Sequence, residues 1–190
     1  MKKTTIERIA YEAIGQHADP YPFFPPSIYY RFLRKLAFEM RPRLSVELGV
    51  CGGGASFHLA TGHPSGRVIG IDVGIEYPSN IAFITQNCPN WTMLIGDSVG
   101  LAYRVRAFVQ ECGPIGILFI DTVHTYEQTM REMSAYRPMM ARGGVICLDD
   151  LFREGMPQVW SEIKEPKMRL DALHLGGSPT DGGFGVILCE

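Results

Sequence analysis

The sequence predicts an α/β fold in which helices cover both faces of a doubly wound, mostly parallel β-sheet. Two observations predict it. Short apolar runs of strand length alternate with stretches whose apolar residues recur at helical spacing. A strand–helix–strand order implies right-handed crossovers, which place the strands parallel and the helices on the two faces. The apolar runs occupy residues 44–48, 68–71, 92–95, 115–120 and 145–148.

Apolar stripes predict helices before three of these runs. One stripe precedes the first run, and similar stripes precede the fourth and the fifth, each with a spacing of three or four residues. The stripes are Ile28, Phe32, Leu36 and Met40; Leu101, Val105, Phe108 and Cys112; and Met130, Met133, Tyr136 and Met140.

The last part of the chain departs from this alternation. Apolar runs at 170–175 and 184–188 are joined by a glycine-rich turn at 176–183, with no helical pattern between them. This arrangement predicts a closing hairpin, so the last strands include one antiparallel member. Residues 17–30 are rich in proline and aromatic residues, which predicts an extended or turning backbone. They fit either a lid over a site or an arm packed on the core.

Length and charge bound the class of protein. A chain of 190 residues favours a single domain, with an N-terminal arm and helix over 1–43 and a core over 44–190. The net charge of −2 excludes a strongly basic nucleic-acid binder. No apolar run approaches the roughly 20 residues of a membrane span, and the N-terminus lacks the apolar stretch of a secretory signal. Five scattered cysteines without a C-x-x-C pair fit a reducing cytoplasm.

Glycines follow the first apolar run at four of six positions: Gly49, Gly52, Gly53 and Gly54. They let the backbone turn sharply and approach a ligand closely. The next residues can begin a helix whose N-terminal amides face that ligand. The spacing matches neither G-x-G-x-x-G nor a P-loop, which weakens a dinucleotide or nucleoside triphosphate as the ligand. Taken alone, the segment is equally consistent with a tight strand–helix connection.

Acidic residues at the strand ends favour a ligand. Asp72 ends the second run, and Asp97 with Ser98 ends the third. A carboxylate after the second strand is placed to accept hydrogen bonds from ribose hydroxyls, and one after the third can face adenine. Carboxylates around the pocket would repel a phosphate. A ligand with ribose and adenine but no phosphate is S-adenosylmethionine.

The motif E-x-G-x-x-x-G at Glu47, Gly49 and Gly53, followed by Asp72 and by Gly-Asp-Ser at 96–98, resembles the class I S-adenosylmethionine-dependent methyltransferases. The resemblance covers roughly residues 44–190 and implies a seven-stranded, Rossmann-like sheet with an antiparallel last strand. It also implies that Glu47 and the glycine loop meet the amino-acid part of the cofactor, that Asp72 meets the ribose, and that Asp97 and Ser98 meet the adenine. The loop residues are Gly49, Val50, Gly52 and Gly53.

Three carboxylates and a histidine follow the fourth and fifth runs. Asp121 and His124 come after the fourth run, and Asp149 and Asp150 after the fifth. The two strand ends are neighbours in this topology, and like charges at such a point need a cation between them. All-oxygen ligation suits magnesium or calcium. In the alternative interpretation Asp150 caps a helix beginning at Leu151, Asp121 is a plain strand-end residue, and His124 bonds a backbone group in the first turn of a helix.

The patterns Asp-x-x-His-x-Tyr after the fourth run and Gly-Gly-x-Ile-x-x-Asp-Asp at the fifth resemble the macrolide-sugar O-methyltransferases and the cephalosporin-hydroxylase-like proteins grouped with them. This resemblance implies that Asp121, Asp149 and Asp150 bind magnesium. It makes His124 the general base, with Asp121 shared between catalysis and the cofactor. Those sugar enzymes carry a long N-terminal extension, whereas about 40 residues precede the first run here. The substrate pocket must therefore be built differently.

The sequence therefore predicts a cytoplasmic, magnesium-dependent O-methyltransferase for a small hydroxylated molecule. We expect no nucleic-acid or membrane partner, and a homo-oligomer is left open. Two alternatives remain: a metal-independent methyltransferase acting on nitrogen or RNA, and a non-catalytic S-adenosylmethionine-binding module. The chain has no Asn/Asp-Pro-Pro-Tyr motif after the fourth run, which counts against nitrogen chemistry on bases.

Overall fold

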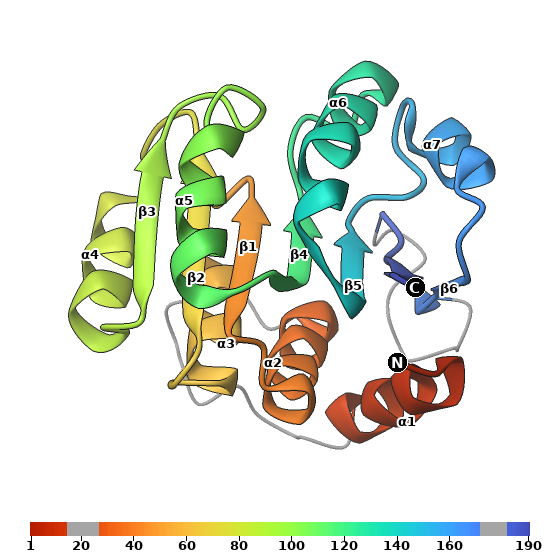
Figure 1. The fold of residues 1–190 in the computed structure, drawn as a ribbon, viewed down its shortest axis with the longest axis horizontal. Coiled ribbons are helices and arrows are strands. Elements are labelled where there is room, and N and C mark those ends of the chain that lie inside the picture. Colours follow the sequence, from red (N-terminus) through yellow and green to blue (C-terminus); the bar gives the residue numbers. More distant parts are fainter. Residues whose placement is uncertain (15–26, 172–181) are drawn as a thin grey trace.

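A computed structural model describes residues 1–14, 27–171 and 182–190. These residues form a seven-stranded sheet in the order β3-β2-β1-β4-β5-β7-β6 (Figure 1). Strands β1 to β5 pair in parallel, and β7 runs antiparallel to both of its neighbours. The predicted α/β class, the mostly parallel sheet and its antiparallel last strand are confirmed.

The central strands lie where their apolar runs predict them. Both β1 and β4 are buried along their whole length. Burial on both faces explains the continuous apolar sequence of β4, whereas β1 buries the polar residues Ser45 and Glu47 as well. Their bounds match the prediction, and β2, β3 and β5 contain the predicted runs. The strands are β1 (Leu44–Leu48), β2 (Arg67–Asp72), β3 (Trp91–Ile95), β4 (Ile115–Ile120), β5 (Met140–Leu148), β6 (Lys167–Arg169) and β7 (Gly185–Leu188).

One predicted strand is tested only at its first two residues. Leu170 and Asp171 of the run expected at 170–175 are not in a strand, residues 172–175 lie outside the described part of the chain, and the edge strand β6 occupies Lys167–Arg169. An edge strand needs only one apolar face, and here Met168 alone is buried, at 6% exposure, between two charged neighbours. A search for apolar runs therefore misses it.

The helices follow two of the three stripes closely. The third stripe ends early, because Pro138 lies in the short 3₁₀ turn Arg137–Met139 and stops the helix, so Met140 opens β5 instead. The helices are α1 (Lys3–Ile14), α2 (Ile28–Met40), α3 (Gly54–Gly62), α4 (Pro78–Asn87), α5 (Ala102–Cys112), α6 (Tyr126–Tyr136) and α7 (Met156–Glu162).

The start of α2 corrects a second expectation. Residues 28–30, expected to be extended or turning, form the first turn of this helix. Ser27 caps it, because its hydroxyl accepts a hydrogen bond from the backbone N–H of Tyr29 at 3.2 Å. Residues 17–26 of the proline-rich segment lie outside the described residues.

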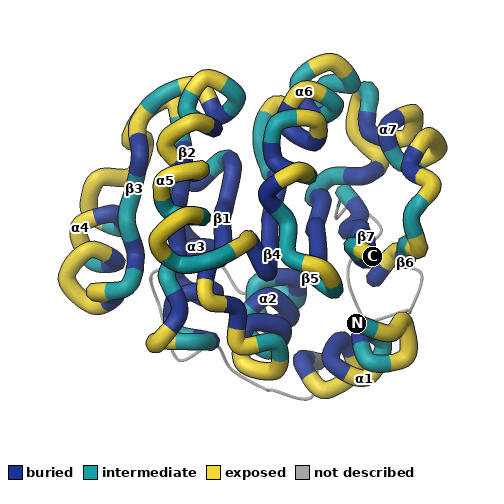
Figure 2. The backbone as a smooth tube through the Cα atoms, viewed as in Figure 1, coloured by how far each residue is buried: buried dark blue, intermediate teal, exposed yellow. Residues whose placement is uncertain are grey.

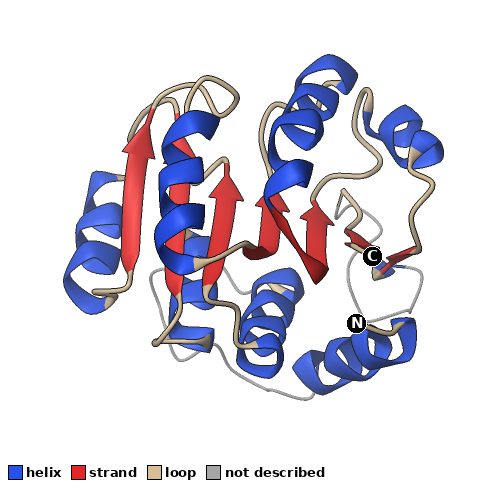
Figure 3. Ribbon diagram, in the orientation of Figure 1, coloured by secondary structure: helices blue, strands red, loops and turns tan. Residues whose placement is uncertain are grey.

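Two apolar layers hold the helices on the sheet. Helices α1 to α4 contribute to one buried cluster, and α5 to α7 contribute to the other. The sheet therefore lies between two helical layers, as Figure 3 shows. The two central strands, β1 and β4, are buried along their whole length (Figure 2).

An aromatic cluster joins distant parts of the chain on the first of these faces. The ring centroid of Phe184 lies 4.7 Å from that of Tyr29, 5.7 Å from that of Phe119 and 5.9 Å from that of Phe32. The ring of Phe184, just before β7, therefore packs on both helix α2 and strand β4.

Two further findings bear on the class of protein. None of the helices in the three described ranges is long and apolar enough to cross a membrane. All five cysteines are free.

Candidate active site

The glycine loop after β1 is held against the end of β4. Gly49 has φ +88°, and a Cβ at this position would overlap the backbone carbonyl oxygen of Asp121. Gly53, with φ +80°, directly precedes α3 in the left-handed region. Both positions therefore require glycine, one for close approach and one for the turn into the helix.

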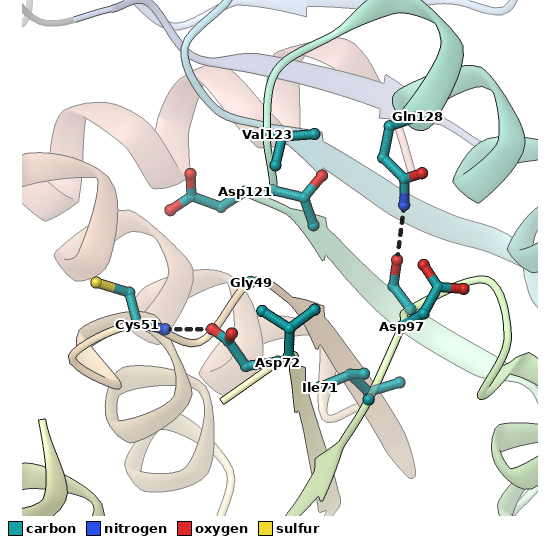
Figure 4. Close-up of a pocket in the computed structure, with 12 residues that line it drawn as sticks. Gly49, Cys51, Ile71, Asp72, Asp97, Asp121, Val123 and Gln128 are labelled. Carbon is teal, nitrogen blue, oxygen red and sulfur yellow. Dashed lines mark hydrogen bonds between the residues drawn. The ribbon is translucent and has the colours of Figure 1, made fainter. Parts of the chain in front are cut away.

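Asp72 fastens the same loop from the β2 side. Its Oδ2 accepts hydrogen bonds from the backbone N–H groups of Val50 and Cys51, both at 2.8 Å. Figure 4 shows the bond from Cys51. The carboxylate that was predicted to meet a ribose thus also sets the shape of the loop.

A cavity of about 390 Å³ lies at the carboxyl ends of the first four strands (Figure 4). This size suits a small molecule. Among the predicted cofactor residues, Gly49, Asp72, Asp97, Ser98 and Asp121 line it. Ile71, Val73 and Val123 add apolar surface, and two polar residues that the sequence analysis did not select, Thr122 and Gln128, also line it.

Four predicted cofactor residues lie outside this lining: Glu47, Val50, Gly52 and Gly53. Glu47 is 1% exposed, and the hydroxyl of Ser56 donates a hydrogen bond to its carboxylate. The indole N–H of Trp91 donates to the same Ser56 oxygen at 2.8 Å. Burial raises the pKa of Glu47 well above its ordinary value. A contact between Glu47 and the cofactor stays a prediction.

A second buried carboxylate, Glu132 of α6, lies behind the pocket wall with no exposed surface. It accepts hydrogen bonds from the hydroxyl of Ser98 at 2.5 Å, the hydroxyl of Thr122 at 3.0 Å and the amide of Gln128 at 2.9 Å. The sequence analysis missed it. The available signal was a charged residue beside Met133 on the inward face of the helix.

Asp121, His124 and Asp150 come together as predicted. The Nε2 atom of His124 lies 3.2 Å from Asp121 Oδ1 and 3.5 Å from Asp150 Oδ2. The chain turns sharply at two of these residues, since His124 has φ +55° and Asp150 has φ +52°. Asp150 caps no helix, because α7 begins only at Met156 with Gly155 as its N-cap.

Negative charge exceeds positive charge in this cluster. The backbone N–H of Asp150 donates to Asp149 at 2.9 Å. Burial, and then the charge of Asp121, raise the pKa of Asp149 to about 7. The hydrogen bond with Asp121 raises the pKa of His124, and Arg153 adds a cation 2.8 Å from Asp150.

The carboxylates fit a hard cation by their chemistry, since Mg²⁺ prefers oxygen ligands. In their present arrangement, His124 and Arg153 contact the oxygens that such a cation would use. Within the described ranges, no three His, Cys, Asp or Glu side chains are grouped so that they could hold a metal ion. Magnesium ligation by Asp121, Asp149 and Asp150 therefore stays a prediction.

Tyr30 of α2 is another residue near the site that the sequence analysis did not select. A Cβ on Gly54 would overlap its ring. Burial, followed by the charges of Asp121, Glu47 and Asp149, raises the pKa of Tyr30, so its phenol stays neutral. On α2 it lies two positions from both Ile28 and Phe32, away from the apolar stripe, so no sequence pattern marks it.

The strand order, the antiparallel β7 and the pocket beyond the carboxyl ends of the parallel strands define the class I methyltransferase fold. A sequence comparison assigns the family. The sequence model described as "Rhamnosyl O-methyltransferase/CmcI" matches residues 30–170, and the chain belongs to this family. It is therefore an enzyme of the methyltransferase class.

Solved structures agree on the fold. A methyltransferase from Geobacter sulfurreducens superposes with a TM-score of 0.63 at 20% identity, covering 98% of this chain and 87% of that one. The O-methyltransferase from Bacillus cereus, in complex with SAH, gives 0.63 at 18% identity, with 100% and 92% covered. The O-methyltransferase TomG from Streptomyces achromogenes, in complex with SAM, gives 0.61 at 15%, with 100% and 92% covered. No curated protein matches the sequence.

Proposed function

We propose that this protein transfers the methyl group of S-adenosylmethionine to a hydroxyl group of a small molecule, with Mg²⁺ held by Asp121, Asp149 and Asp150. One observation carries the proposal. Asp121 both lines the 390 Å³ pocket and contacts His124 at 3.2 Å, so one residue joins the cofactor cavity to the acid–base cluster.

His124 has the role of general base in this proposal. Its Nε2 faces the carboxylates and shares its hydrogen with Asp121, so we assign the other ring nitrogen, Nδ1, to take the proton of the acceptor hydroxyl. Asp121 holds the ring in that orientation and stabilises the imidazolium that results, in keeping with the raised pKa of His124.

The remaining chemistry comes from the bound groups. Mg²⁺ supplies Lewis acidity that eases loss of the hydroxyl proton, and S-adenosylmethionine supplies a methyl group already activated by its sulfonium charge. The residues of the chain hold the bound groups in position. Gly49 and Asp72 shape the cofactor loop, and the ring of Tyr30 lies against Gly54 at the start of α3. We further propose that the enzyme works in the cytoplasm, which its five free cysteines support.

The test measures methyl transfer from labelled S-adenosylmethionine to a panel of sugars and catechols, with Mg²⁺ and with chelator. We expect transfer to at least one hydroxyl, a loss of about a hundredfold or more with chelator, and recovery when Mg²⁺ is added back. His124→Gln should lower kcat by about 10²- to 10⁴-fold. Glu127→Gln, an exposed change three residues further along the chain in the first turn of α6, is the matched control and should leave activity intact.

The contacts of His124 and Arg153 with the carboxylates favour one second candidate, an O-methyltransferase that uses His124 without a metal. Full activity in chelator, together with loss in His124→Gln, would select it. If calorimetry detects no binding of S-adenosylmethionine to the wild type, both candidates fail.

A further inference from the structure

One wall of the cofactor pocket is organised by a group that lies behind it. Ser98, Thr122 and Gln128 line the cavity, and each donates a hydrogen bond to the carboxylate of Glu132. These three residues come from the β3–α5 loop, the β4–α6 loop and α6. Glu132 itself is fully buried and does not line the cavity.

The direction of these hydrogen bonds fixes what the wall offers to a ligand. An ionised carboxylate can only accept, and a hydroxyl has one hydrogen and two lone pairs. The hydrogens of Ser98 and Thr122 therefore point to Glu132. Thr122 keeps both lone pairs for the cavity, and Ser98 keeps one, because its oxygen also accepts from the amide of Gln128. Both amide hydrogens of Gln128 are also committed, one to Glu132 at 2.9 Å and one to Ser98 at 3.1 Å.

The rest of this end of the pocket suits a flat ring that carries a hydrogen-bond donor. Ile71 and Val123 provide apolar surface. Asp97 adds a carboxylate, which is again an acceptor and already receives the backbone N–H of Gly100. The side-chain polar atoms offered here by Ser98, Thr122 and Asp97 are thus acceptors, the complement of an exocyclic amino group.

We infer that Glu132 is a positioning residue that makes this wall select an amino-bearing base. The protein then takes an adenosyl ligand and rejects the inosyl analogue, in which a carbonyl oxygen replaces the 6-amino group. The carbonyl would meet the lone pairs of Ser98 and Thr122. This inference rests on the proposed use of S-adenosylmethionine and adds the residue that sets its base specificity.

The test compares the dissociation constants of S-adenosylhomocysteine and S-inosylhomocysteine by calorimetry. The wild type should bind the adenosyl ligand at least about tenfold more tightly. In Glu132→Gln the new amide can donate to Ser98 and Thr122, which frees their hydroxyl hydrogens for the ligand. We expect the ratio of the two constants to fall below about threefold. Glu127→Gln on the same helix should keep the wild-type ratio.

Thr122→Val provides a second variant that leaves the buried carboxylate in place, should Glu132→Gln fold poorly. It removes one acceptor from the wall with little change in volume, so the ratio should again fall. A loss of packing alone would weaken both ligands together and leave the ratio unchanged. Equal binding of both ligands by the wild type, or an unchanged ratio in Thr122→Val and in any folded Glu132→Gln, overturns the inference while the proposed function stands. Failure of the wild type to bind S-adenosylhomocysteine overturns both.

Discussion

Two glutamates are buried near the site, and they differ in the number of side-chain hydrogen bonds that they accept. Glu132 receives three side-chain hydrogen bonds, from two hydroxyls and one amide. Glu47 has one side-chain donor, the hydroxyl of Ser56, and burial raises the pKa of Glu47. A buried carboxylate with few donors favours its protonated form, which links Glu47 to the stability of the fold.

Glu47 should make the free energy of unfolding depend on pH. Its pKa is above the ordinary value of 4.5 in the folded state, so between these two pKa values the folded chain holds a proton that the unfolded chain has lost. Stability from this group therefore falls as the pH rises through that interval, by up to about 1.4 kcal/mol per pH unit. Glu47→Gln cannot titrate, so it should become more stable relative to the wild type as the pH rises.

Urea unfolding of the two proteins between about pH 5 and pH 8 measures this difference. Glu111→Gln, on the exposed surface of α5, is the matched control and should follow the wild type. A constant difference between Glu47→Gln and the wild type at every pH would show that Glu47 is not held in a protonated form.

At the same scale, the sequence predicts the residues of the site whose types carry the chemistry. Asp121, His124 and Asp150 could be selected because each follows a predicted parallel strand, and such strand ends meet at one edge. Tyr30 and Glu132 could not be selected in this way. Their roles depend on which side of a helix packs against the loops, and that packing is set by residues far away in the chain.

At the scale of elements, the loop between β1 and α3 is held from both sides. Asp72 at the end of β2 binds its N–H groups, and the backbone of Asp121 at the end of β4 lies against Gly49. The shape of the loop therefore depends on the spacing of three neighbouring strands.

Gly49→Ala should disrupt this arrangement. Alanine at φ +88° is strained, and its Cβ would overlap the Asp121 carbonyl. We expect a loss of about 2 kcal/mol or more in the free energy of unfolding, and a large loss of cofactor affinity because the loop must move. Chemical denaturation and calorimetry measure the two effects.

Gly74→Ala is the control for this prediction. An added Cβ at Gly74 meets no atom within 4 Å, so the change should stay within about 0.5 kcal/mol. Similar stabilities for the two variants would mean that the β1–α3 loop tolerates displacement and is not clamped between Asp72 and Asp121.

Elements with a continuous or periodic apolar pattern could be predicted, and elements with few buried residues could not. Strands β1 and β4 have uniform burial, and α2 has an apolar stripe. In contrast, α4 buries only Ile81 and Ile84, and α7 buries Met156 and Val159. These two helices have too few buried apolar residues to show a helical periodicity in the sequence. Pro78 at the start of α4 is nevertheless a typical helix-start signal.

At the scale of the whole molecule, Phe184 joins parts of the chain that are distant in sequence. It contacts α2 through Tyr29 and Phe32 and strand β4 through Phe119. It is fully buried, and all three contacts lie on the face that α1 to α4 cover.

Phe184→Ala should therefore destabilise the entire fold, by about 3–5 kcal/mol, since it leaves a cavity among three aromatic rings. Phe152→Ala is the matched control. Its ring is 49% exposed and has a cation–π contact with Arg169 at 4.9 Å, so removal should cost about 1 kcal/mol or less. Thermal unfolding compares the two, and equal losses would contradict a central role for Phe184.

The gathering of acidic residues at one edge of the sheet is also a property of the whole molecule. The chain has a net charge of only −2, yet Asp72, Asp97 and Asp121 line one pocket, with Asp149 and Asp150 close by. The sequence predicts this gathering, because parallel strands bring their carboxyl ends to one edge. It does not reveal that Glu47 points into the interior, since that depends on the burial of β1 on both faces.

The position of β7 in the sheet affects how the protein folds while it is being synthesised. β6 is synthesised before β7 but has β7 as its neighbour, and β5 pairs with β7 along its outer side. Until residues 185–188 have been translated, β5 presents an open edge and β6 has no β7 to pair with. Nascent chains therefore pass through a stage with an unpaired, strongly apolar strand, when chaperone binding or aggregation competes with closure of the sheet.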